Sequence, residues 1–184
     1  MSLQGERSWL AKGAQTVDAH GGLDREGEGR WVVESPLGRM CLRARGEVVT
    51  GLSFEGVGEA VGEEPPVVRR ARAWVADYFL GRFRPPDFAI EPRGTPFQLR
   101  VWSAVRELAV GETRSYGEVA AALGCGSARA VGQALGRNPL LLLIPCHRVI
   151  GAHRQLGGYA GGLSRKRALL ALEGARKDAG GHLL

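Results

Sequence analysis

The sequence predicts a mixed α/β fold of the α+β type, arranged as two small domains. Short apolar runs separated by turn residues fill positions 31–54, which is typical of a small antiparallel sheet. Helix-start signals recur after residue 93 and indicate a mainly helical second domain that contains a helix-turn-helix. The expected boundaries are a flexible segment 1–30, an N-terminal domain 31–92, a C-terminal domain 93–176 and a tail 177–184.

In the first domain, three short strands and one helix are expected. The strands combine apolar residues with flanking turn signals, and they are expected at 31–33, 40–42 and 48–54. Pro65-Pro66 predicts a helix start, and apolar residues at helical spacing continue the helix as far as Gly81. Residues 84–95 contain three prolines and a glycine and are interpreted as the linker between the domains.

In the second domain, two capping boxes predict helix starts. Thr95 and Gln98 form the first box, with Pro96 at the first helical position. Ser115 and Glu118 form the second box. We therefore expect one helix after each box.

A third helix is expected at 128–137, with Ser127 as its cap. The tight glycine-containing turn before it gives the pattern of a helix-turn-helix, in which Arg129 would face the nucleic acid. Gly132 and Gly136 each cost roughly 1 kcal/mol relative to alanine, which suggests close approach of another surface. Ordinary helical hairpins give the same pattern, so the motif alone is a weak signal.

Charge is distributed unevenly along the chain. Residues 1–92 carry 12 Lys or Arg against 14 Asp or Glu, whereas residues 93–177 carry 13 against 4. A compositional preference for arginine would affect both halves, and the first half does not share it. The second half is therefore expected to attract a polyanion such as nucleic acid.

The composition narrows the class of protein. A chain of 184 residues that is 44% hydrophobic can form a core. Neither a membrane-spanning run nor a signal peptide is recognisable, so a cytoplasmic location is expected. The protein is also expected to be a monomer. Cys41, Cys125 and Cys146 are odd in number and widely spaced, which fits a reducing compartment. No spacing typical of a zinc site occurs, and neither a metal nor a cofactor is expected.

The central hexapeptide is Ile-Pro-Cys-His-Arg-Val at 144–149. The apolar run 140–144 leads into it and is interpreted as a buried strand or core segment that ends at Pro145. A rigid lead-in followed by the thiol of Cys146 and the imidazole of His147 is typical of a nucleophile held beside a base. The alternative is a core cysteine next to a surface histidine.

Two features follow the hexapeptide. Residues 157–162 surround Tyr159 with four glycines, which favours the wall of a pocket over a flexible surface loop, since glycine lets backbone approach a ligand. Ser164 is then expected to cap a basic helix that ends near Glu173. A carboxylate in the last turn opposes the helix dipole, so Glu173 is expected to have a long-range partner.

These residues closely resemble the methylated-DNA–protein-cysteine methyltransferases, also called O6-alkylguanine-DNA alkyltransferases. The resemblance covers about residues 31–174. It is densest from Gly94 to Glu173. Four motifs in matching order carry it, which are RAVG at 129–132, RNP at 137–139, PCHR at 145–148 and GYAGG at 158–162. It implies a DNA-repair protein that binds double-stranded DNA containing O6-alkylguanine, with O4-methylthymine as a further candidate substrate.

The resemblance also implies roles for the central residues. Cys146 is similar to the nucleophile that accepts the alkyl group irreversibly, so that one molecule repairs one lesion. His147 resembles the base that draws the thiol proton through a water, and Glu173 the carboxylate that orients it. Neighbouring side chains do not face each other, so a water between Cys146 and His147 is physically reasonable. Asn138 resembles the residue that braces the turn before the cysteine.

DNA contacts are implied in the same way. Tyr116 resembles the tyrosine at the flipped nucleotide, and Arg129 the side chain that fills the gap in the duplex. Gly117 and Gln98 are further expected DNA contacts. The base must leave the stack because the alkylated oxygen lies inside it. The expected base pocket is lined by Val149, Tyr159 and Ala160.

The chain departs from the family pattern at several points. Ala109-Val110 replaces a commoner proline-plus-bulky pair, and His153-Arg154 stands where an acidic-glycine pair is frequent. The second change puts the shape of the loop after the active site in doubt. The small Ala160 leaves the range of alkyl sizes open, and zinc ligands of some relatives are absent from the first half.

Three other functions are considered. A non-repairing alkyltransferase-like protein would bind lesions without transfer, but such proteins lack the acceptor cysteine. A cysteine hydrolase would turn over an ester or peptide many times. A transcription regulator would bind a defined sequence and be indifferent to loss of Cys146.

Overall fold

The computed structural model describes residues 27–54 and 64–175. The chain forms two compact units, Met1–Glu91 and Pro92–Leu184. Of the expected flexible segment 1–30, only the last four residues are described, and the expected tail 177–184 lies wholly outside the described residues. The α+β fold class is confirmed, since unit 1 combines a sheet with one helix and unit 2 is mainly helical.

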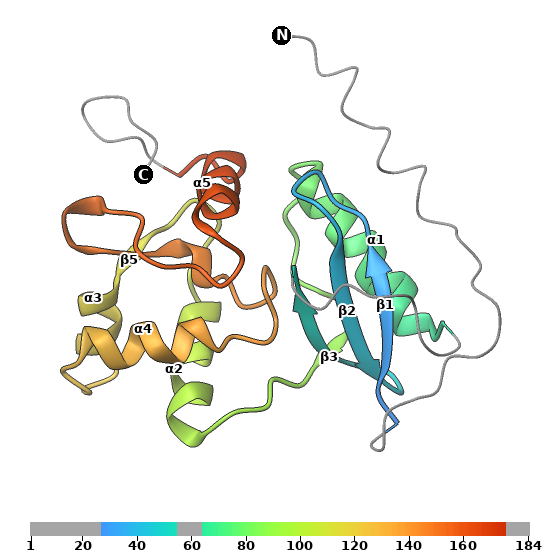
Figure 1. Cartoon of the computed structure of the whole chain (residues 1–184), viewed down its shortest axis with the longest axis horizontal. Coiled ribbons are helices and arrows are strands. Elements are labelled where there is room, and N and C mark those ends of the chain that lie inside the picture. The colour runs from blue at the N-terminus through green and yellow to red at the C-terminus, as the bar shows by residue number, and fades with distance from the viewer. Residues whose placement is uncertain (1–26, 55–63, 176–184) are drawn as a thin grey trace, which may run out of the picture. The chain divides into compact units, whose positions relative to one another are not determined.

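Unit 1 is a four-stranded sheet with the order β1-β2-β3-β4, against which one helix packs (Figure 1). Its elements are β1 (Gly29–Val33), β2 (Met40–Arg45), β3 (Val48–Ser53), α1 (Pro66–Phe79) and β4 (Ala89–Ile90). β1, β2 and β3 pair antiparallel as expected. Pro66 begins α1, and Val68, Ala71 and Val75 place its apolar side on the sheet.

The linker prediction for 84–95 is wrong in one respect, because this segment contains β4. Val48 pairs with Ala89 and Val49 with Ile90 in a parallel register, so the sheet is mixed. The amide of Glu91 then donates to the carbonyl of Val49 at 2.9 Å. Prolines on both sides hid this two-residue strand, since proline cannot donate to a sheet ladder.

Unit 2 is built from helices, short 3₁₀ turns and one small parallel pair of strands. The elements are α2 (Pro96–Arg106), β5 (Arg114–Ser115), α3 (Tyr116–Ala122), α4 (Ala128–Gly136), η3 (Cys146–Arg148), β6 (Val149–Ile150), η4 (Ala152–Arg154) and α5 (Leu163–Leu172). α2, α3 and α4 pack on one another, and α5 packs against η3 (Figure 1). No described helix is both long and apolar enough to cross a membrane.

The predicted helix starts at α2, α3 and α4 are confirmed. Both capping boxes are complete, with the Thr95 and Ser115 hydroxyls accepting from backbone amides and the Gln98 and Glu118 side chains accepting in return. The Ser127 hydroxyl accepts from the amide of Ala130 at 3.2 Å. The starts are therefore fixed by local side-chain chemistry.

The predicted cap of α5 is wrong. The helix begins at Leu163, its cap is Gly162 with φ +90°, and no side chain caps it. Ser164 lies inside the first turn, past the capping position. The glycine can adopt the positive φ that brings the chain into the helix.

The apolar run 140–144 is fully buried but is not a strand. It folds into tight turns, in which the amide of Leu143 donates to the carbonyl of Leu141 and that of Ile144 to the carbonyl of Leu140. Leu142 has φ +69°, which is rare for a residue other than glycine. Of the two alternatives left open, the run is therefore a core segment, which holds the chain rigidly before Pro145.

The loop after the hexapeptide contains two further residues other than glycine with a positive φ. His153 and Arg154 have φ +53° and +60°, and the amide of Gln155 donates to the carbonyl of Ala152 at 3.3 Å. This turn resembles the type in which Asn-Gly is preferred. His153 and Arg154, at which the sequence departs from the family pattern, are thus the two residues that adopt this unfavourable conformation.

Candidate active site

Cys146 is the first residue of η3 and is only 4% exposed. Asn138, two residues after the end of α4, holds it in place. The Nδ2 atom of Asn138 lies 3.1 Å from the Sγ atom of Cys146 and donates to the carbonyl of Ile144 at 2.9 Å. Its Oδ1 atom accepts from the amide of Leu140 at 2.9 Å. One side chain therefore fixes both the turns before the cysteine and the thiol itself.

The Cys146 thiol is protonated at rest. Burial raises its pKa to about 11, and this effect outweighs the hydrogen bond from Asn138 and the charge of Lys166, which lower it. A thiolate is the reactive form of cysteine. Chemistry at Cys146 therefore needs a group that removes the proton during the reaction.

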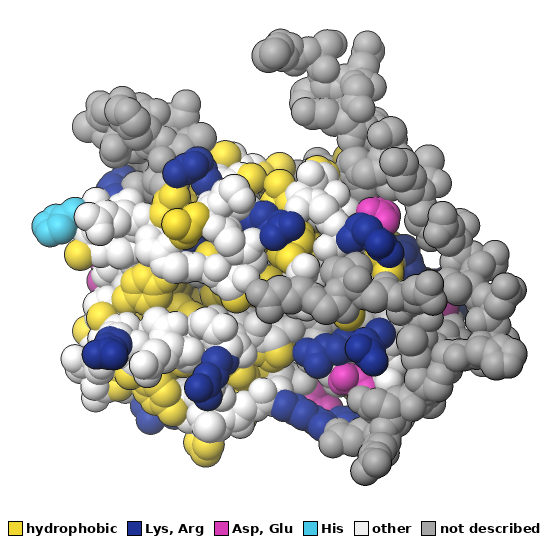
Figure 2. Space-filling view, in the orientation of Figure 1, with side chains coloured by type: hydrophobic (Ala, Val, Ile, Leu, Met, Phe, Trp, Pro, Cys, Tyr) yellow, Lys and Arg dark blue, Asp and Glu magenta, His cyan; other side chains and the backbone are white. Residues whose placement is uncertain are grey.

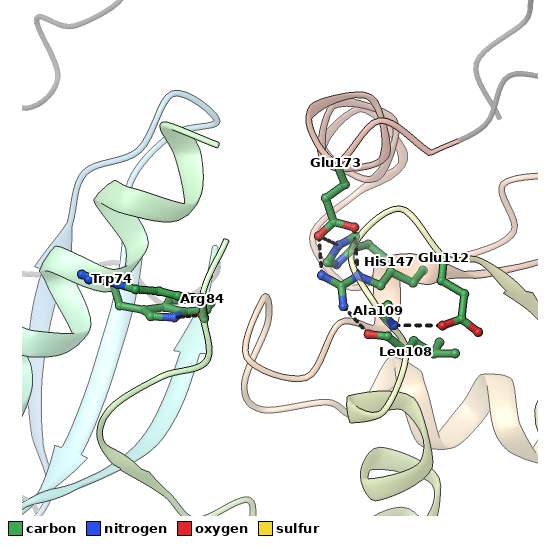
Figure 3. Close-up of polar contacts among 8 residues, drawn as sticks. Trp74, Arg84, Leu108, Ala109, Glu112, His147 and Glu173 are labelled. Atoms are coloured by element: carbon green, nitrogen blue, oxygen red, sulfur yellow. Dashed lines mark hydrogen bonds and ion pairs between the residues drawn. The ribbon is translucent and has the colours of Figure 1, made fainter. Parts of the chain in front are cut away.

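His147 and Glu173 form a fully buried pair beside the thiol segment. The Nε2 atom of His147 lies 3.0 Å from Oε1 of Glu173, which comes from the C-terminal end of α5 (Figure 3). Burial lowers the pKa of His147, although Glu173 acts in the opposite direction. The imidazole is thus neutral near pH 7 and able to accept a proton.

Arg148 also binds Glu173. Its Nε and Nη2 atoms donate to the two carboxylate oxygens at 2.8 and 2.6 Å, and Nη1 donates to the carbonyl of Leu108 at 2.6 Å. Glu173 therefore has two long-range partners, which confirms the expectation from its position in the last helical turn. The bidentate pairing holds the carboxylate in one orientation.

Tyr116 lies between α4 and the glycine segment 157–162. Its hydroxyl donates to the carbonyl of Gly158 at 3.0 Å, and burial raises its pKa. A Cβ atom at Gly157 would lie 2.8 Å from the Tyr116 ring, and one at Gly132 would lie 3.6 Å away. Gly157 thus permits the close approach of backbone to the ring, and the predicted close surface at Gly132 is this tyrosine. At Gly136 the same prediction is wrong, because a Cβ atom there would meet no described atom within 4 Å.

Of the three predicted pocket residues, Val149 and Tyr159 lie next to the thiol segment. Val149 follows η3 directly and is fully buried, and Ala160 is half-buried. The Tyr159 ring meets the His147 ring edge-on at 6.3 Å between centroids. Its hydroxyl is buried and has no hydrogen-bond partner among the described residues, and burial raises its pKa well above the usual value.

Of the predicted DNA contacts, Gly117 and Arg129 lie on the two helices of the helix-turn-helix, and Gln98 lies on α2. Arg129 is exposed in the first turn of α4 and Gly117 is exposed in the first turn of α3. Gln98 is half-buried, and its Oε1 atom accepts from the amide of Thr95. On the face that Figure 2 shows, Lys and Arg side chains lie at several places over this unit, and carboxylates are almost absent from that face. Binding of DNA by these residues stays a prediction.

Sequence analysis missed two members of the site, Lys166 and Arg148. Lys166 was grouped with the other cations of a basic helix. It lies on the same face of α5 as Leu169, Leu170 and Glu173, at the spacing that puts residues on one side of a helix. That spacing was the available signal. Arg148 belonged to the recognised motif, but nothing in its sequence position pointed to Glu173.

The chain is similar to one protein family and to known proteins of that family. A family model described as the DNA-binding domain of 6-O-methylguanine DNA methyltransferase matches residues 96–175. The methylated-DNA–protein-cysteine methyltransferase of Mycobacterium tuberculosis is 44% identical over 153 residues, covering 80% of this chain and 93% of that protein. The enzyme of the same name from Methanosarcina acetivorans is 42% identical over 151 residues, covering 78% and 97%.

Solved structures give the same result. The O6-methylguanine methyltransferase of Mycobacterium tuberculosis has a TM-score of 0.72 at 42% identity, covering 83% of this chain and 96% of that one. A structure of the M. tuberculosis protein in complex with DNA has the same TM-score at 44% identity, covering 80% and 94%. The similarity therefore extends over both units.

Proposed function

The chain belongs to the methylated-DNA–protein-cysteine methyltransferases, and from this premise we propose that Cys146 removes an alkyl group from O6 of guanine in double-stranded DNA. The observation that carries the proposal is the buried arrangement of Asn138, Cys146, His147 and Glu173. In this arrangement the protonated thiol of Cys146 is followed in the chain by the neutral imidazole of His147. The carboxylate of Glu173 orients that imidazole.

The proposed reaction begins with loss of the thiol proton. His147 is the base, and its Nε2 atom faces Glu173, so Nδ1 takes the proton through a water. The sulfur of Cys146 then attacks the alkyl carbon. The sulfur–carbon bond forms, the bond from carbon to O6 breaks, and its electron pair passes to the purine. The purine takes up one proton and becomes guanine.

The alkyl group stays on sulfur, so each molecule reacts once. Breaking a thioether by hydrolysis would need an activated water and a better leaving group than this thiolate. The proposal is therefore a stoichiometric transfer and not a turnover reaction. The acceptor is the protein itself.

The target base has to be flipped out of the duplex, since O6 lies inside the stack. We propose that Arg129, exposed at the start of α4, fills the gap, and that Tyr116 contacts the flipped nucleotide. Val149, Tyr159 and Ala160 line the pocket for the base. Gly117 and Gln98 are the further proposed contacts to the DNA, and the protein is proposed to act as a monomer.

The test is mass spectrometry after incubation with an oligonucleotide duplex that contains one O6-methylguanine. One methyl group per protein molecule is expected, on the peptide that contains Cys146. Cys125→Ser is the matched control, because Cys125 is a half-buried thiol of the same unit, and it should transfer normally. Cys146→Ser should bind the duplex and transfer nothing.

Different outcomes identify the other functions. An unmodified Cys146 together with tight binding to the lesion would indicate a lesion-binding protein. Release of more product than protein would indicate turnover. Sequence-selective binding that ignores both the lesion and Cys146→Ser would indicate a regulator.

A further inference from the structure

The loop that follows β6 carries two basic side chains at its tip. His153 and Arg154 are both exposed, and both have a positive φ, of +53° and +60°. Two consecutive left-handed residues are unfavourable unless they are of the Asn-Gly kind. The turn therefore keeps two large side chains at a cost in stability, which indicates that the side chains themselves have a role.

The base of this loop is fixed to unit 2. The amide of Gly151 donates to the carbonyl of Gln155 at 2.6 Å and closes the loop beneath its tip. Leu156 packs against a buried cluster that includes Ile150 and Leu170. The tip therefore projects from an anchored base, and its two side chains are held in one region of the surface.

The loop lies beside the tyrosine proposed to meet the flipped nucleotide. β6 pairs in parallel with β5, the strand that leads directly into Tyr116, so the loop leaves this pair of strands beside the start of α3. At its other end, a Cβ atom at Gly157 would lie 2.8 Å from the Tyr116 ring. His153 is two residues from Gly151, so its Cα atom lies within about 7 Å of that glycine. Both ends of the loop thus flank Tyr116, and its tip lies close by.

The surroundings of the tip favour an anionic partner. Residues 119–172 contain seven Lys or Arg and no Asp or Glu. Arg154 is exposed, as is Arg129 at the start of α4. Within the part of the chain that the structure describes, neither His153 nor Arg154 takes part in a hydrogen bond or an ion pair. Both side chains are therefore available to a ligand, and the positive field of this region attracts a polyanion.

We propose that His153 and Arg154 bind the sugar-phosphate backbone of the duplex beside the flipped nucleotide. The guanidinium of Arg154 pairs with a phosphate, and the imidazole of His153 donates to a neighbouring backbone oxygen. Such contacts position the duplex and do not read its sequence or the lesion. This inference rests on the proposed function, because it takes duplex DNA as the partner.

The test uses variants that separate charge from backbone strain. Arg154→Gln removes the charge, Arg154→Lys keeps it, and His153→Asn combined with Arg154→Gly gives the turn its preferred residues. Arg106→Gln is the matched control, because Arg106 is exposed in the last turn of α2, at the opposite end of that helix from Gln98.

Three quantities are measured for each variant. Dissociation constants are determined for a duplex with one O6-methylguanine and for the same duplex without it, between about 50 and 200 mM KCl. Single-turnover transfer is followed at saturating DNA, and stability is followed by urea unfolding.

We expect Arg154→Gln to bind both duplexes about tenfold more weakly, the factor for one charge-assisted hydrogen bond. The slope of log affinity against log salt should become shallower by about one, since one phosphate contact is lost. Transfer at saturating DNA should be unchanged, and Arg154→Lys should keep the wild-type slope. The double variant should bind at least as weakly as Arg154→Gln and yet unfold at a higher urea concentration than the wild type, because its turn is relaxed.

Four results would overturn the inference. These are a wild-type affinity and salt slope in Arg154→Gln, an equal loss in Arg106→Gln, a loss confined to the methylated duplex, and a double variant that is less stable than the wild type. A wild-type protein that binds both duplexes and transfers nothing would instead refute the proposed function. In that case the affinities of the variants would still decide whether the loop binds the DNA backbone.

Discussion

The two units place their charged side chains in opposite ways. In the described part of unit 1, ion pairs lie at the surface, as in Arg70–Glu47, whose side chains are 44% and 58% exposed. The buried polar side chains there are the hydroxyls of Ser35 and Thr50. In unit 2, burial includes an amide and four ionisable groups, which are Asn138, His147, Arg148, Lys166 and Glu173.

This difference separates a scaffold from a reactive centre. Each buried ionisable group costs several kcal/mol unless partners compensate it, so such groups are rare where only stability is selected. All five buried groups of unit 2 contact either the Cys146 segment or one another. Burial of charge therefore marks the site independently of any sequence motif.

Of the variants that test this difference between the units, Glu173→Gln is expected to have the largest effect on stability and transfer. Because it removes the counter-charge of Arg148 and leaves that buried cation unpaired, we expect a loss of about 3–5 kcal/mol in the free energy of unfolding. Transfer should also slow at least tenfold. Urea unfolding and single-turnover kinetics measure the two effects.

The control for this variant is Glu112→Gln. Glu112 is a carboxylate of the same unit that accepts from the amide of Ala109 at 2.9 Å (Figure 3), but its side chain is partly exposed. It should lose less than about 1 kcal/mol. Full transfer by Glu173→Gln would contradict the relay.

An exposed charge of unit 2 should behave differently from the buried ones. Arg129→Ala removes the side chain proposed to fill the duplex, so transfer should slow by about tenfold, equivalent to about 1.4 kcal/mol. Its stability should change by less than about 0.5 kcal/mol, because Arg129 is exposed. A large loss of stability would show that the residue supports the fold instead.

The pH dependence of stability sharpens the same comparison. Burial lowers the pKa of His147 in the folded protein, whereas in the unfolded chain the pKa of this histidine is near 6.5. Below pH 6.5 the unfolded chain therefore binds more protons at this residue than the folded protein does. Stability should be full above pH 6.5 and fall as the pH drops below it, by at most about 1.4 kcal/mol per pH unit for one histidine. His147→Gln should lose this part of the pH dependence, as measured by urea unfolding at pH 7.5, 6.5 and 5.5.

The smallest effect is expected in unit 1. Arg70→Ala breaks an ion pair that lies in water, so we expect a change of about 0–1 kcal/mol in unfolding and no change in transfer. Thermal unfolding and single-turnover kinetics are sufficient to measure both. A loss as large as that of Glu173→Gln would refute the distinction between the units.

Helix starts were predictable because the chain encodes them locally. The boxes at Thr95 and Ser115 need only residues three positions apart, so their hydrogen bonds could be foreseen. β4 could not be foreseen, because its two residues are ordered by pairing with β3, more than forty positions earlier in the chain. The left-handed Leu142 was hidden for the same reason, since tertiary burial imposes a conformation that leucine does not prefer.

The residues of the site also differ in whether local sequence or the fold reveals them. The motif around Cys146 and His147 was visible as neighbouring residues, and Glu173 was noticed because its charge opposes the helix dipole. Lys166 lies between two arginines in sequence, and only its place on the inner face of α5 distinguishes it from them. The residue types needed for the reaction could be recognised in the sequence. Which cation of α5 is buried depends on the fold, which shields Lys166 from water.

The tight seating of the acceptor has a consequence for the molecule after repair. The sulfur of Cys146 is already within 3.1 Å of an amide nitrogen and is almost completely enclosed. An added methyl group has to be accommodated by displacement of neighbouring atoms, and overpacking of this kind typically costs about 1–3 kcal/mol. A spent molecule should thus be physically distinguishable from a fresh one by a lower free energy of unfolding.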